Sequence, residues 1–149
     1  MKYFSVCFGF VLAMAFFNFG PVPNAPELEI EGSGDLYIRG SRVGEIERDG
    51  DIYIRGSRVG EIESDGDVYK GGSRIGEIES DGDIYYKGSR VGEVESDGDV
   101  YKNGSRIGEV ESDGDIYYRG SRIGECEGVD RAWVGAVVFF FFAEELGVN

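Results

Sequence analysis

Carboxylates recur every 16 residues in this 149-residue chain, and they are the first residues that could do chemistry. Each repeat carries clustered Asp and Glu, so that Asp51 is expected to lie beside Glu47 and Glu63. Carboxylate oxygens are the ligands that Ca²⁺ prefers, and an ion would relieve the repulsion between like charges facing each other in a sheet. Solvent screening is the alternative. Because no complete calcium motif is present, we predict no metal site and leave calcium at this acidic rim as an open hypothesis.

A second recurring set is basic. The sequence Gly-Ser-Arg occurs in all six repeats, and its arginines are Arg42, Arg58, Arg74, Arg90, Arg106 and Arg122. Further basic residues lie close to these motifs, namely Arg39, Arg55, Lys70, Lys87, Lys102 and Arg119. The six motif arginines could form a rim that binds an anionic partner, such as lipid headgroups or an acidic glycan. Alternatively, they are solvated and form weak ion pairs with nearby glutamates, as exposed charges usually do.

Several function classes are excluded by what the chain lacks. There is no histidine, which removes Ser-His-Asp and Cys-His nucleophiles and His-ligated zinc. A net charge of −14 argues against nucleic acid, because phosphate binding needs a basic surface. Cys7 and Cys126 are too few for a disulfide framework. Repetition also argues against catalysis, which needs one asymmetric constellation. We therefore predict no enzyme, no catalytic residue and no cofactor.

The repeat itself indicates the elements that position these charges. One unit runs from Asp51 to Gly66, and the six units begin at Asp35, Asp51, Asp67, Asp83, Asp99 and Asp115. Two short polar motifs, Gly-Ser-Arg and Ser-Asp-Gly, are typical of hairpin loops. We interpret each unit as two five-residue strands and two three-residue loops, which gives twelve antiparallel strands. With both loops of equal length, Ile52 is expected opposite both Ile46 and Ile62.

A closed barrel is the predicted architecture. An open ribbon of twelve strands would leave two exposed edges, which closure removes. A solenoid of stacked coils is the alternative for a 16-residue period. Alternation along each strand predicts one inner face and one outer face. The inner face receives Leu36, Ile46, Ile52, Ile62, Val68, Ile78, Ile84, Val94, Val100, Val110, Ile116 and Cys126, and the outer face receives tyrosines flanked by glutamates. Those tyrosines could bind carbohydrate or mediate self-association, or they simply suit strands.

A hydrophobic segment near the C-terminus is predicted to fill the barrel. Residues 132–143 carry no charge, Asp130 can cap a helix that begins there, and Gly147 is placed to end it. Six inward glycines, one in each unit, would leave room for the phenylalanines of residues 139–142; they are Gly44, Gly60, Gly76, Gly92, Gly108 and Gly124. The alternative is a short tail that dips into a membrane.

The N-terminal region is predicted to be a signal peptide or a membrane anchor. Lys2 precedes the apolar residues 3–17, and Ala13-Met14-Ala15 has the pattern of a cleavage site. Pro21, Pro23 and Pro26 form a stiff joint. The predicted organisation is thus residues 1–25 for export or anchoring and residues 27–149 for the barrel, with repeats over 35–128 and a helix over 131–146. Residues 28–31 are expected to form an additional edge strand.

The repeated motif Asp-Ile-Tyr-x-x-Gly-Ser-Arg-Val-Gly-Glu-Ile-Glu, followed by a hydrophobic helix, resembles the β-flower proteins. These are shallow barrels of hairpin repeats, similar in structure to the Tubby C-terminal domain, which surrounds a hydrophobic helix with twelve strands and binds phosphoinositide headgroups. The resemblance implies the architecture, whereas no ligand-binding motif is matched. The predicted role is that of an exported or membrane-anchored structural or binding domain. The alternative is a membrane-surface module that binds lipid headgroups through its cationic rim.

Overall fold

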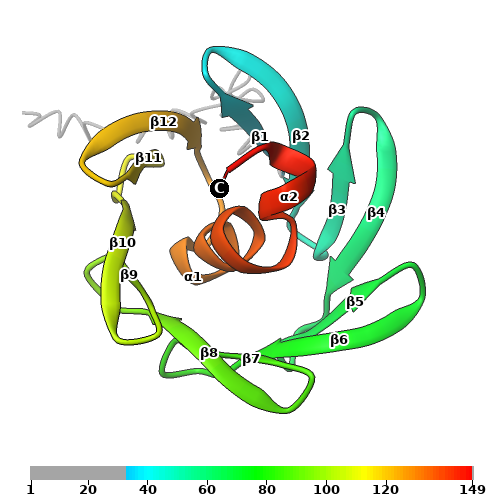
Figure 1. The fold of residues 1–149 in the computed structure, drawn as a ribbon. Coiled ribbons are helices and arrows are strands. Elements are labelled where there is room, and N and C mark those ends of the chain that lie inside the picture. Colours follow the sequence, from blue (N-terminus) through cyan, green and yellow to red (C-terminus); the bar gives the residue numbers. More distant parts are fainter. Residues whose placement is uncertain (1–32, 149) are drawn as a thin grey trace, which may run out of the picture.

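The computed structural model describes residues 33–148, which form a closed antiparallel barrel around a short helical segment (Figure 1). Each strand pairs with its neighbours in the chain, and β1 pairs with β12 to close the ring. The strands are β1 (Ser33–Ile38), β2 (Ser41–Glu47), β3 (Asp51–Ile54), β4 (Ser57–Ile62), β5 (Asp67–Lys70), β6 (Ser73–Ile78), β7 (Asp83–Tyr86), β8 (Ser89–Val94), β9 (Asp99–Lys102), β10 (Ser105–Val110), β11 (Asp115–Tyr118) and β12 (Ser121–Cys126). The predicted barrel is confirmed, and the solenoid alternative is wrong.

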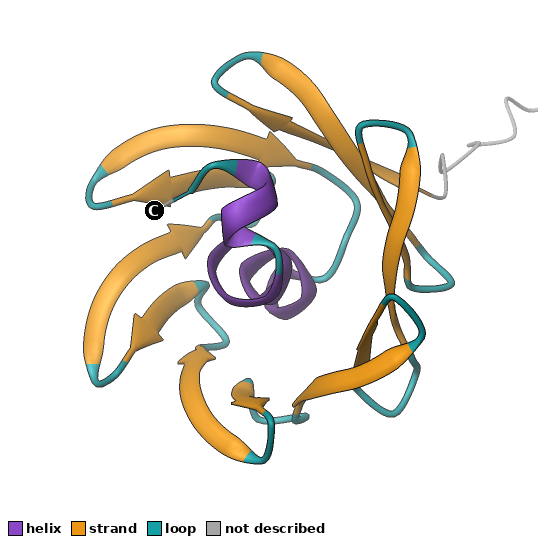
Figure 2. Ribbon diagram, turned by 45° about the vertical axis from the view of Figure 1, so that its right-hand side comes forward, coloured by secondary structure: helices purple, strands orange, loops and turns teal. Residues whose placement is uncertain are grey.

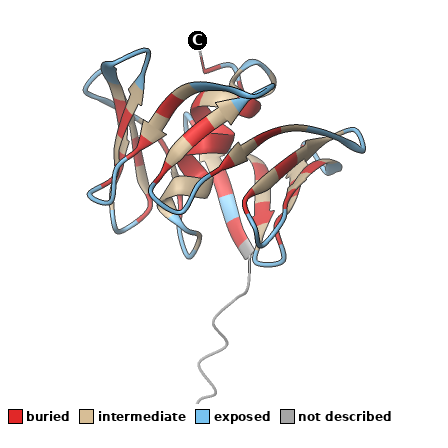
Figure 3. Cartoon of the chain, turned by 90° about the horizontal axis from the view of Figure 1, so that it is seen from below, coloured by how far each residue is buried: buried red, intermediate tan, exposed pale blue. Residues whose placement is uncertain are grey.

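The predicted inner face is confirmed residue by residue. All twelve aliphatic or thiol side chains assigned to it are buried, none more than 6% exposed. Cys126 lies among them, and burial raises the pKa of its thiol to about 12, so the thiol stays protonated and behaves as a small apolar group. Figure 3 shows the buried stretches along the wall and the central helix, with the hairpin turns exposed.

The Ser-Asp-Gly loops have the predicted length. The amide of Glu63 donates to the carbonyl of Asp67 at 2.8 Å, which leaves three residues between the paired positions. Gly66 closes the loop with φ of 94°, a left-handed conformation that glycine adopts without steric cost. Across the equivalent loop between β2 and β3, Ile52 faces Ile46, as predicted.

The Gly-Ser-Arg motif is not a three-residue loop, and the register expected across it is wrong. Arg55 and Gly56 form a two-residue turn, with φ of 52° and 77°, and Ser57 already belongs to β4. Such turns match the twist of the flanking strands. A register shift follows, so that Ile52 faces Gly60 instead of Ile62, and Tyr53 faces Arg58. Because a bulge bends and twists a strand, this irregularity, repeated in every hairpin, helps to curve the wall.

The C-terminal segment lies inside the ring (Figure 2) and comprises α1 (Arg131–Ala136), the π-helix η1 (Val137–Phe141) and α2 (Ala143–Leu146). The carboxylate of Asp130 accepts from the amides of Ala132, at 2.8 Å, and Trp133, at 3.3 Å. Gly147 ends the segment with φ of 69°. The predicted plug with its two caps is confirmed, and the membrane-dipping tail is wrong. The expected single α-helix is instead interrupted by a π-helical turn.

Successive phenylalanines contact successive hairpins. Phe142 lies against Gly60, Phe141 against Gly76, Phe140 against Gly92 and Phe139 against Gly108. Each step of one residue therefore moves one hairpin around the ring, about 60° for six hairpins, whereas an α-helix turns by about 100° per residue. A π-helix turns less per residue, so the π-helical turn brings the phenylalanines closer to the spacing of the wall.

The predictions for residues 1–32 lie outside the described residues, including the export signal, the proline joint and the extra edge strand. Within residues 33–148, no helix is long and apolar enough to cross a membrane.

Candidate functional site

The six motif arginines lie on the outer face of the barrel, within the second strand of each hairpin. Each forms ion pairs with two carboxylates of its own hairpin. Arg58 shows the pattern, since its Nη2 lies 2.5 Å from Asp51 Oδ1 and 2.7 Å from Glu61 Oε2. The hydrogen bond from Arg58 holds the pKa of Asp51 below its usual range. Each of these guanidinium charges is therefore balanced locally.

A different set of cations surrounds the barrel opening at the two-residue turns. We call the end formed by Arg39, Arg55, Lys70, Lys87, Lys102 and Arg119 the turn-end mouth. Arg55, Lys87 and Arg119 occupy the left-handed position of their turns and form no ion pair within residues 33–148. Arg39 donates to the carbonyl of Gly147 at 3.3 Å.

Aromatic rings lie under four of these six cations. Lys102 Nζ is 5.6 Å from the ring centre of Phe140, and Arg119 is 4.9 Å from that of Tyr118. Lys70 Nζ lies 5.0 Å from the ring centre of Phe142 and also forms an ion pair with Glu145. Such stacking holds a cation in place while leaving it able to meet an anion.

The turn-end mouth is asymmetric, although the wall repeats. The last residue of each hairpin's first strand faces inward here, and these residues are Ile38, Ile54, Lys70, Tyr86, Lys102 and Tyr118. Ile38 and Ile54 are buried at the ends of β1 and β3. At Lys70, Tyr86 and Lys102, in contrast, a cleft of about 290 Å³ opens between the wall and the plug, where residues 143–145 of α2 line it.

Sequence reasoning placed both sets of cations on one rim and missed this division. The signal was present in the repeat. The second position of each unit is always aliphatic, whereas the fourth changes from Ile to Lys or Tyr. Because this position varies while the second stays aliphatic, it can make one part of the mouth different from another.

The opposite end of the barrel is acidic. Five carboxylate triads lie there within residues 33–148, the first being Glu47, Asp49 and Asp51, with ligand atoms within 4.8 Å of one another. The expectation that Asp51 also lies beside Glu63 is wrong, because the bulge brings Glu61 opposite Asp51. Burial and the neighbouring carboxylates raise the pKa of Glu47. Calcium at this end stays an untested hypothesis, since exposed carboxylates alone do not make a metal site.

Comparison with known proteins identifies the type of repeat. A family model described as "5-fold beta-flower protein" matches residues 37–143, which is more than half of the chain. The matched residues run from the last two residues of β1 through β12 and the plug to the first residue of α2. The wall closes with six hairpins, one more than that description counts. No curated protein and no solved structure matches the chain.

Proposed function

The chain belongs to the 5-fold β-flower family, and from this premise we propose that it is a non-catalytic binding domain, exported or held at a membrane by its N-terminal segment. Its binding site is the turn-end mouth, and its ligand is anionic. This moves the predicted anionic site from the six motif arginines to the cations at the turns.

One observation carries this proposal. In a chain with a net charge of −14, cations gather at one end, and five of the six form no ion pair within the described part of the chain. The motif arginines, in contrast, are each matched by two carboxylates. Three of the unpaired cations, Lys87, Lys102 and Arg119, stack on aromatic rings, and Lys102 also lines the cleft. This combination suits an anionic ligand with an apolar part.

The end of the barrel at which β1 begins limits which partner the mouth can reach. β1 begins at Ser33, which pairs with Glu47 at the acidic end of the barrel. A retained N-terminal anchor would therefore attach at the acidic end and present the turn-end mouth away from that membrane. An acidic glycan is the ligand that fits this orientation.

Lipid headgroups are the second candidate, favoured by the exposure of Tyr86. This side chain is 40% exposed at the mouth, and Lys87 Nζ lies 5.2 Å from its ring centre. A tyrosine with an apolar ring and a polar tip suits the boundary between water and membrane. This candidate requires a chain released from its own anchor.

The test compares two triple variants that remove equal charge. Arg55→Asn, Lys87→Asn and Arg119→Asn change the turn tips, where Asn103 already occupies the same turn position with φ of 50°. Arg58→Gln, Arg90→Gln and Arg122→Gln change the outer face. Binding is measured to an immobilised acidic polysaccharide and by flotation with anionic or neutral liposomes. We expect the tip variant to lose about tenfold in affinity and the outer-face variant to change little.

Equal losses in both variants would show that only net charge matters, and no binding to either anionic surface would reject the proposal. Sequencing the mature N-terminus and fractionating the cells test export and anchoring separately.

A further inference from the structure

The turn-end mouth contains a carboxylate that the chain itself supplies. Glu145, on α2, forms an ion pair with Lys70, the last residue of β5. Every other ion pair within residues 33–148 joins two residues of one hairpin, so this is the pair that connects the plug to the wall. Both partners line the cleft of about 290 Å³. The structure therefore shows which kind of anion a lysine of this mouth holds.

The surroundings of Lys70 show how the carboxylate is held. Lys70 Nζ lies 5.0 Å from the ring centre of Phe142 and donates to the carbonyl oxygen of Phe141 at 3.5 Å. Burial acts to raise the pKa of Glu145, but hydrogen bonding and the charge of Lys70 outweigh it and lower the pKa below its ordinary value. The carboxylate is therefore charged at neutral pH, and the ammonium lies between it and the aromatic ring.

Lys102 repeats this arrangement without a carboxylate of the chain. It occupies the same position of the repeat two hairpins further round the ring, and its Nζ lies 5.6 Å from the ring centre of Phe140. It lines the same cleft but is exposed, whereas Lys70 is half-buried. It forms no ion pair within the described part of the chain. A carboxylate from another molecule can therefore pair with Lys102 as Glu145 pairs with Lys70.

Tyr86 lies between the two lysines in the order of the ring, again at the same repeat position. It lines the cleft, and its ring centre is 6.4 Å from that of Phe141. Among residues 33–148 it is the large hydrophobic side chain that is exposed, at 40%. A flat ring with a polar tip suits one face of a sugar, because that face presents apolar C–H groups while the hydroxyls at its edge stay in water.

The size and charge of the cleft limit its ligand. A volume of about 290 Å³ is at the lower end for small-molecule sites, so the cleft suits one sugar ring better than a length of chain. Glu144 also lines it and is exposed. Lys102 balances one negative charge, and Glu144 would repel a second. A phosphate monoester, with a charge of about −1.5 to −2, therefore fits less well than a single carboxylate.

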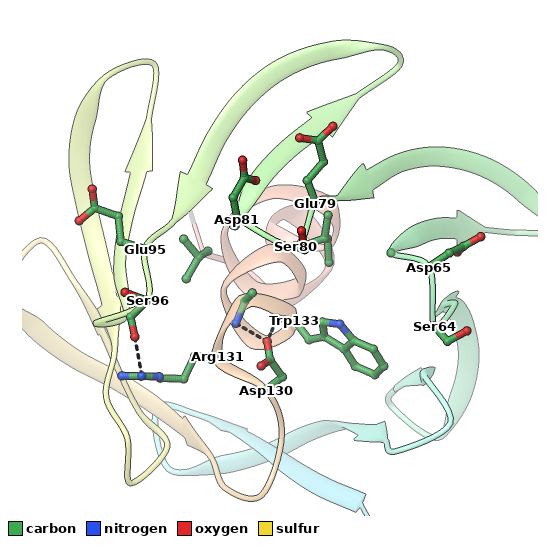
Figure 4. A pocket seen from close by; sticks show the side chains of 15 residues that line it. Ser64, Asp65, Glu79, Ser80, Asp81, Glu95, Ser96, Asp130, Arg131 and Trp133 are labelled. Atoms are coloured by element: carbon green, nitrogen blue, oxygen red, sulfur yellow. Dashed lines mark hydrogen bonds between the residues drawn. The ribbon is translucent and has the colours of Figure 1, made fainter.

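The larger cavity, about 470 Å³ at the acidic end, does not offer the same combination. Trp133 lines it, but the loop carboxylates labelled in Figure 4 point away from Trp133 and from the plug. Its basic residue, Arg131, donates to the backbone carbonyls of Ser96, at 2.6 Å, and Asp97, at 2.9 Å. In the turn-end cleft, by contrast, an unpaired ammonium and an exposed aromatic ring line the same space.

We propose that the cleft binds a single sugar acid, a hexuronate residue of a glycan, with its carboxylate on Lys102 and one face of its ring on Tyr86. This inference rests on the anionic site proposed for the mouth and narrows its ligand to a carboxylated sugar. Because Glu145 already pairs with Lys70, each mouth takes one such residue.

The experiment is an NMR titration of the purified full chain with methyl glucuronoside and, in parallel, with methyl glucoside, which has a neutral hydroxymethyl group in place of the carboxylate. We expect the glucuronoside to bind at least about tenfold more tightly. Octanoate presents the same carboxylate without a sugar, and glycerol 3-phosphate presents the phosphate of a lipid headgroup. Both should bind more weakly than the glucuronoside.

The hairpin of Lys102 offers a matched control. Lys102→Gln removes the charge at the cleft, and Arg106→Gln removes one charge from the outer face, where Arg106 pairs with Asp99 and Glu109. We expect glucuronoside affinity to fall about tenfold in the first variant and to change little in the second. Tyr86→Leu keeps an apolar side chain without the flat ring, so it should weaken glucuronoside binding about fivefold and leave octanoate binding unchanged.

Two further variants test the role of the internal carboxylate. Glu145→Gln removes the charge that pairs with Lys70, whereas Glu144→Gln removes an equal charge from the cleft without touching that lysine. We expect Glu145→Gln to raise glucuronoside affinity about threefold more than Glu144→Gln does. Equal gains would show that only the summed charge of the cleft matters, which would contradict the pairing of a ligand carboxylate with one lysine.

The inference would be overturned by equal binding of glucuronoside and glucoside, by tighter binding of octanoate or glycerol 3-phosphate, or by equal losses in the Lys102 and Arg106 variants. The proposed function fails separately, when the immobilised acidic polysaccharide and the anionic liposomes are not bound at all. Polysaccharide binding that survives Lys102→Gln would overturn the inference alone. The amide spectrum of each variant, recorded in the same titration, distinguishes a lost site from a lost fold.

Discussion

The wall of the barrel repeats, and the segment that it encloses does not. Each of the six hairpins presents one inward glycine and two buried aliphatic or thiol side chains at fixed positions. The plug meets four of those glycines with phenylalanines and the other two without one. The cleft of the turn-end mouth lies where the unique segment meets the repeated one, beside α2. The wall thus provides the enclosure, and the plug makes its sectors different.

Among changes in the plug, Phe142→Ala is expected to cause the largest loss of stability. This side chain is fully buried against Gly60, and its removal should destabilise the fold by about 3–5 kcal/mol. Phe140 is only partly buried, so Phe140→Ala should cost clearly less. Denaturant unfolding measures both. Equal losses of stability would mean that the position of a phenylalanine in the ring does not determine its contribution.

The next largest loss of stability is expected when an inward glycine that contacts the plug is replaced. A Cβ at Gly60 would lie 2.6 Å from Phe142 Cζ and 2.5 Å from the carbonyl oxygen of Tyr69, and we expect Gly60→Ala to cost about 3 kcal/mol. A Cβ at Gly44 would meet only wall backbone, so Gly44→Ala should cost less.

A double-variant cycle isolates the contact itself. Combining Gly60→Ala with Phe142→Ala should cost less than the sum of the two single changes, because the clash with the ring disappears while the clash with the Tyr69 carbonyl remains. Additive losses would indicate that Gly60 is needed by the wall alone.

Removal of the helix cap should have an intermediate effect. Asp130→Ala leaves the amides of Ala132 and Trp133 without their acceptor and should destabilise by about 1 kcal/mol. Asp130→Asn should restore most of this, because asparagine caps helices nearly as well. Thermal unfolding of the two variants provides the measurement, and a loss in the Asn variant as large as in the Ala variant would assign Asp130 another role.

The smallest effects are expected for the exposed charges of the wall, and they depend on pH. Hydrogen bonds from arginines lower the pKa values of Asp51 and Asp83, so the stability that these pairs contribute is present above the unfolded value, about 3.9, and is lost as the pH falls through the lower folded value. Arg58→Gln with Arg90→Gln should flatten this acid dependence in unfolding measured from pH 7 to pH 2. An unchanged dependence would contradict the pairing.

The acidic loops should respond in the opposite sense. The pKa values of Glu79 and Glu111 are raised by burial and neighbouring carboxylates, so their penalty is present at neutral pH and is relieved as the pH falls through the folded value. Glu111→Gln should therefore stabilise the protein slightly at pH 7, less at 1 M salt. A loss of stability at pH 7 would show that the triad is held by an interaction outside the described contacts.

The sequence predicted the inner face because alternation in a strand is a strict geometric rule. Ile52 and its eleven counterparts needed only that rule, and the match of phenylalanines to inward glycines followed from it. The two-residue turn was missed because arginine seldom takes a left-handed conformation. Asn103-Gly104 and Gly71-Gly72, at the same place in other hairpins, are the typical signal for such a turn.

The candidate site was harder to predict because it depends on distances that no repeat encodes. Lys102 lies over the ring of Phe140 only because of where the plug runs within the barrel, and the plug contains a π-helical turn that no sequence motif announces. Arg58 pairs with two carboxylates because the bulge shifts the register of β4 against β3. A register with loops of equal length, as predicted from the sequence, contains no bulge.

Pairing of β1 with β12 also limits how such a gene can grow. A linear array gains a unit at its end while the others keep their places, but in a ring a duplicated 16-residue unit must be inserted between neighbours that are already joined. Every remaining unit then has to change its angle to its neighbours, and the central helix must suit a wider lumen. A change in copy number must therefore come in whole units and be matched by a change in the aromatic residues of the central segment.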